Sequence, residues 1–105
     1  KSIDEIDFEK SGGLVPVIVQ DANTKDVLTL AYSNKESLEL AKKTGNSWFW
    51  SRSRNKLWMK GEESGNTQKV KKILVDCDSD AIIYLVEPSG PACHTGEQTC
   101  FHNDM

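Results

Sequence analysis

The sequence lacks the long apolar segment that a membrane-spanning helix requires, since no run of about 18 apolar residues occurs. Its N-terminal stretch also lacks the basic-then-apolar order of a secretory signal and instead contains Asp4, Glu5, Asp7 and Glu9. We therefore expect a cytoplasmic protein with no membrane partner.

Cysteine is scarce, with Cys77, Cys93 and Cys100 as the 3 thiols of a 105-residue chain. An odd number of cysteines without an export signal argues against a disulfide framework. Free thiols or metal ligands are the better expectation, although any one of these residues alone is equally explained as a small core residue.

Lysine and arginine are absent from residues 73–105, which carry several acids, whereas residues 42–72 are strongly basic. This asymmetry suits either an anionic ligand held beside bound cations or simply solvated faces of different strands. Linkers, repeats and low-complexity tracts are also missing. The chain length and its 37% of hydrophobic residues predict one domain over residues 1–105. A domain this small would gain stability from dimerisation.

The pattern of apolar runs and turn residues predicts three β-hairpins. The strands are expected at residues 14–20 with 27–32, within 47–60, and at 70–75 with 81–86. Pro16 cannot donate to a sheet ladder, so we expect it at an edge or a bulge. Residues 93–105 are expected to be irregular or a short helix.

One helix is predicted over about residues 34–44. Ser33 and Glu36 have capping-box spacing, and Gly45 stands where a left-handed residue would end the helix. The predicted fold is therefore α+β, a β-rich single domain of antiparallel hairpins with one main helix.

Asp76, Asp78 and Asp80 recur at every second residue. We expect them at the tip of the third hairpin. On an extended strand they would share one face, with neighbours about 7 Å apart, and a bend at Ser79 would bring them closer. Carboxylates so close together are usually neutralised by a divalent cation such as Mg²⁺, although an acidic turn in water is the alternative. Ala81 and Glu87 occupy the sixth and twelfth positions of an EF-hand loop starting at Asp76, and apolar residues intervene, so a calcium loop is excluded.

The cysteine spacing lacks the two close pairs of a zinc ribbon. Three thiolates with an open fourth position would instead describe a catalytic zinc, whose bound water has a pKa of about 7. His94 and His102 are the 2 histidines, and either would complete a site or act as a general base. The nucleobase deaminases are excluded because no H-x-E element precedes the cysteines.

The basic middle offers candidates for anion binding. Arg52 and Arg54 are predicted to share a strand face with Trp50. The arginines would suit contacts with phosphate and the indole contacts with a base, although the same alternation is explained by arginines exposed to solvent. The loop from Lys60 to Asn66 contains glycines and a hydroxyl that would cradle a phosphate, although it is not a Walker A loop.

Several motifs in one order resemble those of the phosphoribosyl-AMP cyclohydrolase family of histidine biosynthesis. They are Gly13 to Asp21, Ser51 to Arg54, Leu57-Trp58, Lys60 to Glu62, Ser64 to Asn66, Asp76 to Asp80, Ala92 to Gly96, and Cys100-Phe101. The resemblance spans about residues 8–102. It implies a hydrolase that opens the adenine ring of phosphoribosyl-AMP between N1 and C2, using zinc-activated water with Mg²⁺ assistance.

The resemblance also implies where the site lies. Zinc would be shared across a homodimer, with Cys77 from one subunit and Cys93 and Cys100 from the other. Mg²⁺ would be held by Asp76, Asp78 and Asp80, and His94 would transfer a proton. Arg52, Lys60, Ser64, Gly65 and Asn66 are the candidates for binding the substrate.

Two other classes of function fit parts of the sequence. Trp48, Trp50 and Trp58 with the nearby arginines would suit a small single-stranded nucleic-acid binder, which leaves the thiols and aspartates unexplained. A structural zinc module that docks a protein partner is the second alternative. The enzyme hypothesis expects a small-molecule substrate and no nucleic acid.

Overall fold

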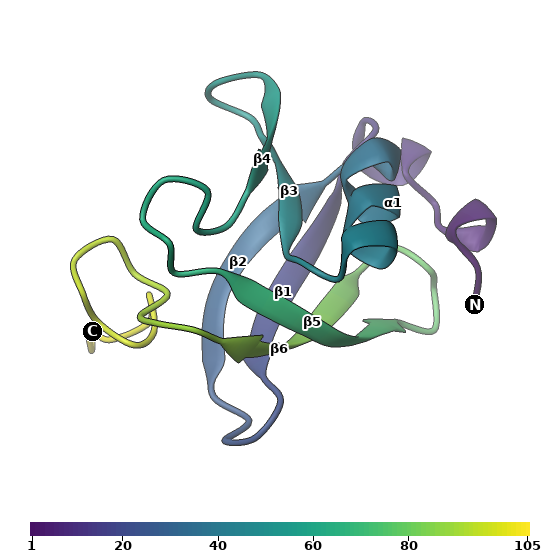
Figure 1. Ribbon diagram of the computed structural model, residues 1–105. Coiled ribbons are helices and arrows are strands. Elements are labelled where there is room, and N and C mark those ends of the chain that lie inside the picture. Colours follow the sequence, from purple (N-terminus) through teal and green to yellow (C-terminus); the bar gives the residue numbers. More distant parts are fainter.

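The computed structural model describes residues 1–105, the side chain of Ser11 aside. A four-stranded sheet has the order β2-β1-β6-β5, and a two-stranded sheet pairs β3 with β4 (Figure 1). The strands are β1 (Val15–Asp21), β2 (Val27–Ser33), β3 (Trp48–Ser51), β4 (Lys56–Met59), β5 (Gln68–Val75) and β6 (Ile82–Pro88). The helices are α1 (Lys35–Thr44) and two short 3-10 turns, η1 (Ile3–Glu5) and η2 (Glu9–Ser11).

All three predicted hairpins are confirmed, because β1–β2, β3–β4 and β5–β6 are antiparallel pairs. The α+β single-domain prediction is confirmed as well. The prediction missed that β1 also pairs with β6 in parallel, with Val19 opposite Tyr84. A parallel pair requires a long crossover, here residues 22–81, and no local sequence pattern indicates it. The main sheet is therefore mixed.

Pro16 lies on an inner strand, so its predicted place at an edge or bulge is wrong. It pairs with Tyr32 of β2, whereas the ladder to β6 starts only at Val17. At Pro16 one side of β1 is thus free of a neighbouring strand, and the missing N–H leaves no gap in the β1–β6 ladder.

Helix α1 begins at Lys35, one residue later than predicted, and the prediction of Ser33 as the cap is wrong. Asn34 is the N-cap: its side chain accepts a hydrogen bond from the Ser37 N–H (2.8 Å), and the Ser37 hydroxyl accepts from the Asn34 N–H (2.9 Å). Ser33 instead ends β2 and is buried. Gly45 ends the helix in the left-handed conformation at φ 79°, as predicted.

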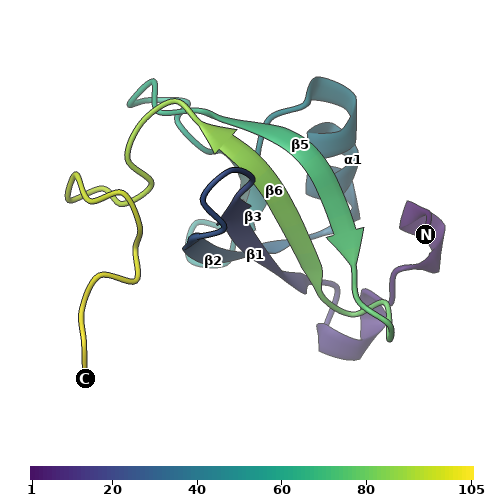
Figure 2. The ribbon, with the colours of Figure 1, turned by 90° about the horizontal axis from the view of Figure 1, so that it is seen from below.

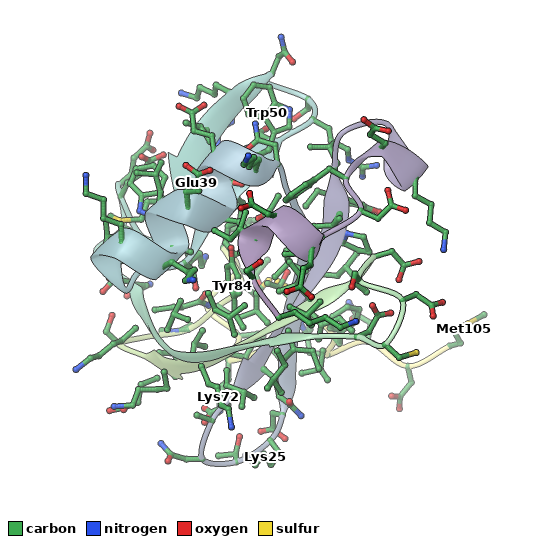
Figure 3. All side chains as sticks on the ribbon, turned by 90° about the vertical axis from the view of Figure 1, so that its right-hand side faces the viewer. Lys25, Glu39, Trp50, Lys72, Tyr84 and Met105 are labelled. Carbon is green, nitrogen blue, oxygen red and sulfur yellow. The ribbon has the colours of Figure 1, made fainter. Side chains whose placement is uncertain are left out.

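The core lies between the main sheet and α1. Alternate residues of β1 and β6 point into it, and Phe49 of β3 and Leu38 of α1 complete it; the strand members are Val15, Val17, Val19, Ile82, Tyr84 and Val86. Tyr84 lies in this interior, whereas Lys72 extends from the side of the sheet away from α1 (Figure 3). The helix covers one face of the sheet only.

The described helices include none that is long and apolar enough to span a bilayer.

Replacing Tyr84 by phenylalanine tests the core. The buried ring packs on Phe49 with centroids 5.7 Å apart, and its hydroxyl donates to the Trp48 carbonyl (3.1 Å). Losing that hydrogen bond should lower the free energy of unfolding by about 0.5–1.5 kcal/mol in urea titrations. An unchanged midpoint and slope of the urea unfolding curve would contradict this expectation. Tyr32→Phe is the control, because Tyr32 is half-exposed.

The same variant should also alter the alkaline limit of stability. Burial raises the pKa of Tyr84 from 10.0 to about 12. The folded phenol therefore stays protonated while the unfolded one ionises, so stability present below pH 10 is lost as the pH rises toward 12. Tyr84→Phe should show a smaller loss in this window, measured by urea unfolding at stepped pH.

Candidate metal and substrate site

The predicted aspartate motif lies at the tip of the β5–β6 hairpin, in a turn and not on a strand. The Asp76 N–H donates to the Ala81 carbonyl (3.1 Å), and the Ser79 N–H donates to the Asp76 carbonyl (3.2 Å). Ser79 adopts φ +61°, which reverses the chain. The predicted position of the three carboxylates at the tip of the third hairpin, with a bend at Ser79, is therefore confirmed, whereas the shared face of an extended strand does not apply to them.

The three carboxylates of this tip have different partners. An Asp76 carboxylate oxygen accepts from the Asp80 N–H (3.0 Å), and one of Asp78 accepts from the Cys77 thiol (3.4 Å). An Asp80 oxygen pairs with Nζ of Lys10 (2.7 Å). Across the described side chains of a single chain, no group of three or more His, Cys, Asp or Glu residues is arranged to hold a metal ion.

Two lysines of the N-terminal segment, which the sequence analysis did not single out, bind oxygen atoms of the tip. Nζ of Lys1 donates to the carbonyl oxygens of Asp76 (3.0 Å) and Cys77 (2.9 Å) and to the Ser79 hydroxyl (2.8 Å). The hydrogen bond from Lys10 holds the pKa of Asp80 below its ordinary value, and the same bond raises the pKa of Lys10. The oxygen atoms of this turn therefore already bind the ammonium groups of Lys1 and Lys10 within the chain.

The other two cysteines lie in the C-terminal segment, which is irregular as predicted. Residues 92–98 form a tight loop in which the Cys93 N–H donates to the Glu97 carbonyl (3.1 Å). The Cys100 N–H donates to the Leu28 carbonyl (2.7 Å), and the Thr99 hydroxyl donates to the Val27 carbonyl (2.6 Å). These bonds fasten the segment to β2, the edge strand of the sheet.

The electrostatics around Cys93 favour its thiolate. The Thr95 hydroxyl, 3.0 Å from its sulfur, lowers the pKa of Cys93 most, and Cys100 and the positive charge of His102 lower it further. The thiolate is the form of cysteine that binds metals. Two thiols with an imidazole nearby match the donor set that zinc prefers.

His94, the predicted proton-transfer residue, directly follows Cys93 and is exposed. His102 differs, because its Nδ1 lies 3.0 Å from the Thr99 carbonyl within the segment itself. His94 is thus an exposed histidine that follows the buried Cys93 in the sequence.

Cys77 and the Cys93–Cys100 pair lie at opposite ends of the molecule. The hairpin tip is beside the N-terminal segment, while the yellow C-terminal segment lies across the sheet from it in both ribbon views (Figures 1 and 2). A single chain therefore separates the thiols that the resemblance assigns to one zinc ion.

Trp58 lines two different hollows of the structure. The larger, about 530 Å³, lies between β2 and the β3–β4 hairpin and is lined by Ala31, Tyr32, Trp50, Ser51, Arg52, Ser53 and Trp58. The smaller, about 200 Å³, is lined by Arg54, Trp58, Met59, Gly61, Glu62, Glu63 and Ser64. Aromatic walls with a guanidinium at the rim suit a base and a phosphate.

The arginines reach these hollows from a turn. Residues 52–55 connect β3 to β4, so the prediction that Arg52 and Arg54 share a strand face with Trp50 is wrong. The Arg52 guanidinium stacks over the Tyr32 ring at 3.9 Å, and that of Arg54 lies 5.9 Å from the Trp58 ring. Tyr32 gave no local signal in the sequence, because its role depends on contact with a distant turn.

The other predicted substrate residues divide into two groups. Ser64 lines the smaller hollow, whereas Lys60, Gly65 and Asn66 are not part of the lining of either hollow. Asn66 packs instead against Gly90, where an added Cβ would lie 2.3 Å from its side-chain oxygen. The Ser89 hydroxyl donates to the Thr67 carbonyl (2.9 Å), so this loop supports the segment leading to Cys93.

Comparison with known proteins identifies the same family as the sequence motifs do. The model of the phosphoribosyl-AMP cyclohydrolase family matches residues 29–102, the stretch that contains the hairpin tip and all 3 cysteines. The chain is 87% identical over its full length to a phosphoribosyl-AMP cyclohydrolase of Nitrosopumilus maritimus and 81% identical to one of Cenarchaeum symbiosum, covering 97% of each. It is 62% identical over its full length to the histidine biosynthesis bifunctional protein HisIE of Bacillus subtilis, of which it covers 50%.

Two glycines of the 61–66 loop make a matched pair for testing this support. Both have a positive φ, +85° at Gly61 and +81° at Gly65, but an added Cβ would meet Asn66 backbone atoms 2.5 Å away only at Gly61. Gly65→Ala should cost about 1–2 kcal/mol from backbone strain. Gly61→Ala should cost about 1–3 kcal/mol more from overpacking. Equal losses in urea unfolding would contradict the described packing.

The Lys10–Asp80 pair gives a pH prediction. Since the pKa of Asp80 is lowered, the pair stabilises the fold at neutral pH, and this contribution is lost as the pH falls through the lowered value. Since the pKa of Lys10 is raised, the contribution is lost again as the pH rises through that value. In Lys10→Met the Asp80 carboxyl should titrate at higher pH by NMR, whereas Lys25→Met, in the β1–β2 turn, should leave it unchanged.

Proposed function

Because the chain belongs to the phosphoribosyl-AMP cyclohydrolase family, we propose that it hydrolyses phosphoribosyl-AMP, opening the adenine ring between N1 and C2 in histidine biosynthesis. The observation that carries this proposal is full-length similarity at 87% identity to a protein of that name. The relatives are named as enzymes, which favours this function over a nucleic-acid binder or a structural zinc module.

We propose further that the active unit is a homodimer with zinc bound between subunits. Cys77 would come from one chain and Cys93 and Cys100 from the other. Two features support this: one chain keeps Cys77 apart from the other thiols, and the surroundings of Cys93 favour its thiolate. When bound, zinc supplies a water molecule activated near neutral pH.

His94 is the proposed proton-transfer residue. His94 directly follows Cys93 in the loop that is closed by the hydrogen bond from the Cys93 N–H to the Glu97 carbonyl. An imidazole can accept a proton at one step and donate one at another.

The substrate would lie against the hollows around Trp58. Arg52 and Ser64 are placed at their walls for phosphate binding, and the aromatic rings of Tyr32 and Trp58 would hold the base. Lys60, Gly65 and Asn66 remain candidates for phosphate contacts.

Mg²⁺ is the proposed partner of the hairpin tip, through Asp76, Asp78 and Asp80. Carboxylates are the donors that this ion prefers. Because Asp80 is paired with Lys10, this ion pair would have to open before all three carboxylates met one ion. The ion would neutralise phosphate charge.

Turnover of phosphoribosyl-AMP tests the function directly. Ring opening should change the ultraviolet absorbance when purified protein is supplied with zinc and Mg²⁺. His94→Ala should lower kcat by about 10²–10⁴-fold with zinc content unchanged. Absence of turnover by the wild-type chain with both metals present would contradict the proposal.

Mixing two inactive variants tests whether the site is shared. Cys77→Ser and Cys93→Ser should each lose zinc and turnover. After unfolding and refolding together at equal amounts, roughly a quarter of all sites should be rebuilt, because each mixed dimer combines an intact Cys77 with an intact Cys93–Cys100 pair. If each site used thiols of one chain only, the mixture would stay inactive.

A further inference from the structure

Two buried polar side chains lie at the base of the 61–66 loop, and the site described above uses neither of them. Ser47 directly precedes β3 and is fully buried, and Gln68 begins β5 and is 1% exposed. The Ser47 hydroxyl and both polar atoms of the Gln68 carboxamide have no hydrogen-bond partner among the residues that the structure describes. Buried polar groups are nearly always paired, because an unpaired one costs its full desolvation energy. These three atoms therefore need a partner.

Backbone pairing brings these two side chains together. Asn46 and Lys69 form an isolated antiparallel bridge, so the next residues inward, Ser47 and Gln68, also lie opposite each other. The Ser47 N–H donates to the Gln68 carbonyl (3.2 Å). Residues directly opposite in an antiparallel pair direct their side chains to the same face, with Cβ atoms about 4.5–5.5 Å apart. The hydroxyl and the carboxamide are thus close enough for one small molecule to bind both.

Ser47 also joins the two ends of the 61–66 loop. Its carbonyl accepts from the Lys60 N–H (2.9 Å), just before the loop, while its own N–H binds the Gln68 carbonyl, just after the loop. The loop carries Ser64, which lines the smaller hollow. The unpaired polar atoms therefore lie where a wall of that hollow is anchored to the rest of the fold.

The same loop contacts the segment that leads to Cys93. The Ser89 hydroxyl lies within hydrogen-bond distance of the carbonyls of Gly65 (3.4 Å) and Thr67 (2.9 Å). The loop between β4 and β5 and the C-terminal segment lie on the same side of the molecule in both ribbon views (Figures 1 and 2). A shift at the base of the loop would therefore reach both the smaller hollow and the segment that carries Cys93.

Water is the ligand that fits these atoms. A buried water molecule typically makes about three hydrogen bonds to groups that are otherwise unpaired. The hydroxyl and the carboxamide together offer both donors and acceptors, which matches a molecule that donates and accepts in turn. Ser47 and Gln68 are neutral, so an ion bound by them would be buried without an opposite charge.

We propose that Ser47 and Gln68 bind a buried water molecule that fixes the base of the 61–66 loop and thereby positions the loop for the substrate. Both are positioning residues, because neither lines a hollow around Trp58. The water links the Ser47 hydroxyl to the Gln68 carboxamide, which adds a side-chain connection to the backbone bond between them. The role toward substrate rests on the proposed hydrolysis of phosphoribosyl-AMP, whereas the water site does not.

A crystal structure of the wild-type chain tests the water site. Electron density should show a water molecule within about 3.2 Å of the Ser47 hydroxyl and of the Gln68 carboxamide. A direct hydrogen bond between the two side chains, or density with no water between them, overturns the proposal.

Gln68→Met tests the positioning role, because methionine keeps the length of the side chain and removes two of the three polar atoms. The Gly65 N–H, bonded to the Gly61 carbonyl within the loop (2.9 Å), should exchange with solvent at least about tenfold faster relative to the Leu85 N–H of β6. KM for phosphoribosyl-AMP should rise about tenfold, with kcat and zinc content within about twofold of the wild type.

Ser33→Ala is the matched control, since Ser33 is as deeply buried as Ser47 but its hydroxyl has partners in the Trp48 carbonyl (3.3 Å) and the Tyr84 hydroxyl (3.4 Å). This variant should lower overall stability while leaving the Gly65-to-Leu85 exchange ratio and KM unchanged. Ser47→Ala, which removes the third polar atom, should move both readouts in the same direction as Gln68→Met and replaces that variant if it does not fold.

The outcomes separate this inference from the proposed function. An unchanged exchange ratio in Gln68→Met, or an unchanged KM while the wild type turns the substrate over, overturns the positioning role. A fall in kcat with KM unchanged overturns it as well. Absence of turnover by the wild type contradicts the proposed function, and the crystal structure and the exchange ratio still decide the water site, because both are measured without substrate.

Discussion

The structure depends above all on the mixed sheet, because the parallel pairing of β1 with β6 fixes where every functional segment lies. β6 is held between β1 and β5, so the hairpin tip with Cys77 projects from one end of the sheet. The chain leaves β6 at the other end and returns to the β2 edge, where Thr99 and Cys100 are hydrogen-bonded. A rigid sheet of this kind cannot bend its two ends together. Sharing of the site between two chains is, in our account, the consequence of that rigidity.

Electrostatics give the two halves of the proposed site different characters. At the tip, ammonium groups of Lys1 and Lys10 lie among backbone and carboxylate oxygens, and the Lys10–Asp80 ion pair neutralises part of the acidic turn. In the C-terminal segment, Thr95 and His102 favour a thiolate at Cys93. The first environment suits a hard cation that competes with lysine, and the second suits zinc.

Local patterns predicted the hairpins and the helix because strand alternation, turn residues and caps act over a few residues. The same reasoning misplaced the helix cap, since Ser33 and Asn34 are both good caps and only the end of β2 decides between them. The β1–β6 pairing could not be predicted, because it joins segments separated by most of the chain. For the site, the motifs identified the family, but the ion pair from Lys10 and the stacking of Arg52 on Tyr32 arise only from tertiary contact.

Identification of disulfides formed by metal-free protein tests the central claim most directly. Equal amounts of unlabelled and ¹⁵N-labelled chains would be refolded together, oxidised mildly, digested and analysed by mass spectrometry. The account predicts disulfides that join the Cys77 peptide to a Cys93 or a Cys100 peptide. Some of these disulfides should join an unlabelled peptide to a ¹⁵N-labelled peptide. Links of Cys77 found only within chains of one isotope, or a Cys93–Cys100 bond with Cys77 left free, would contradict it.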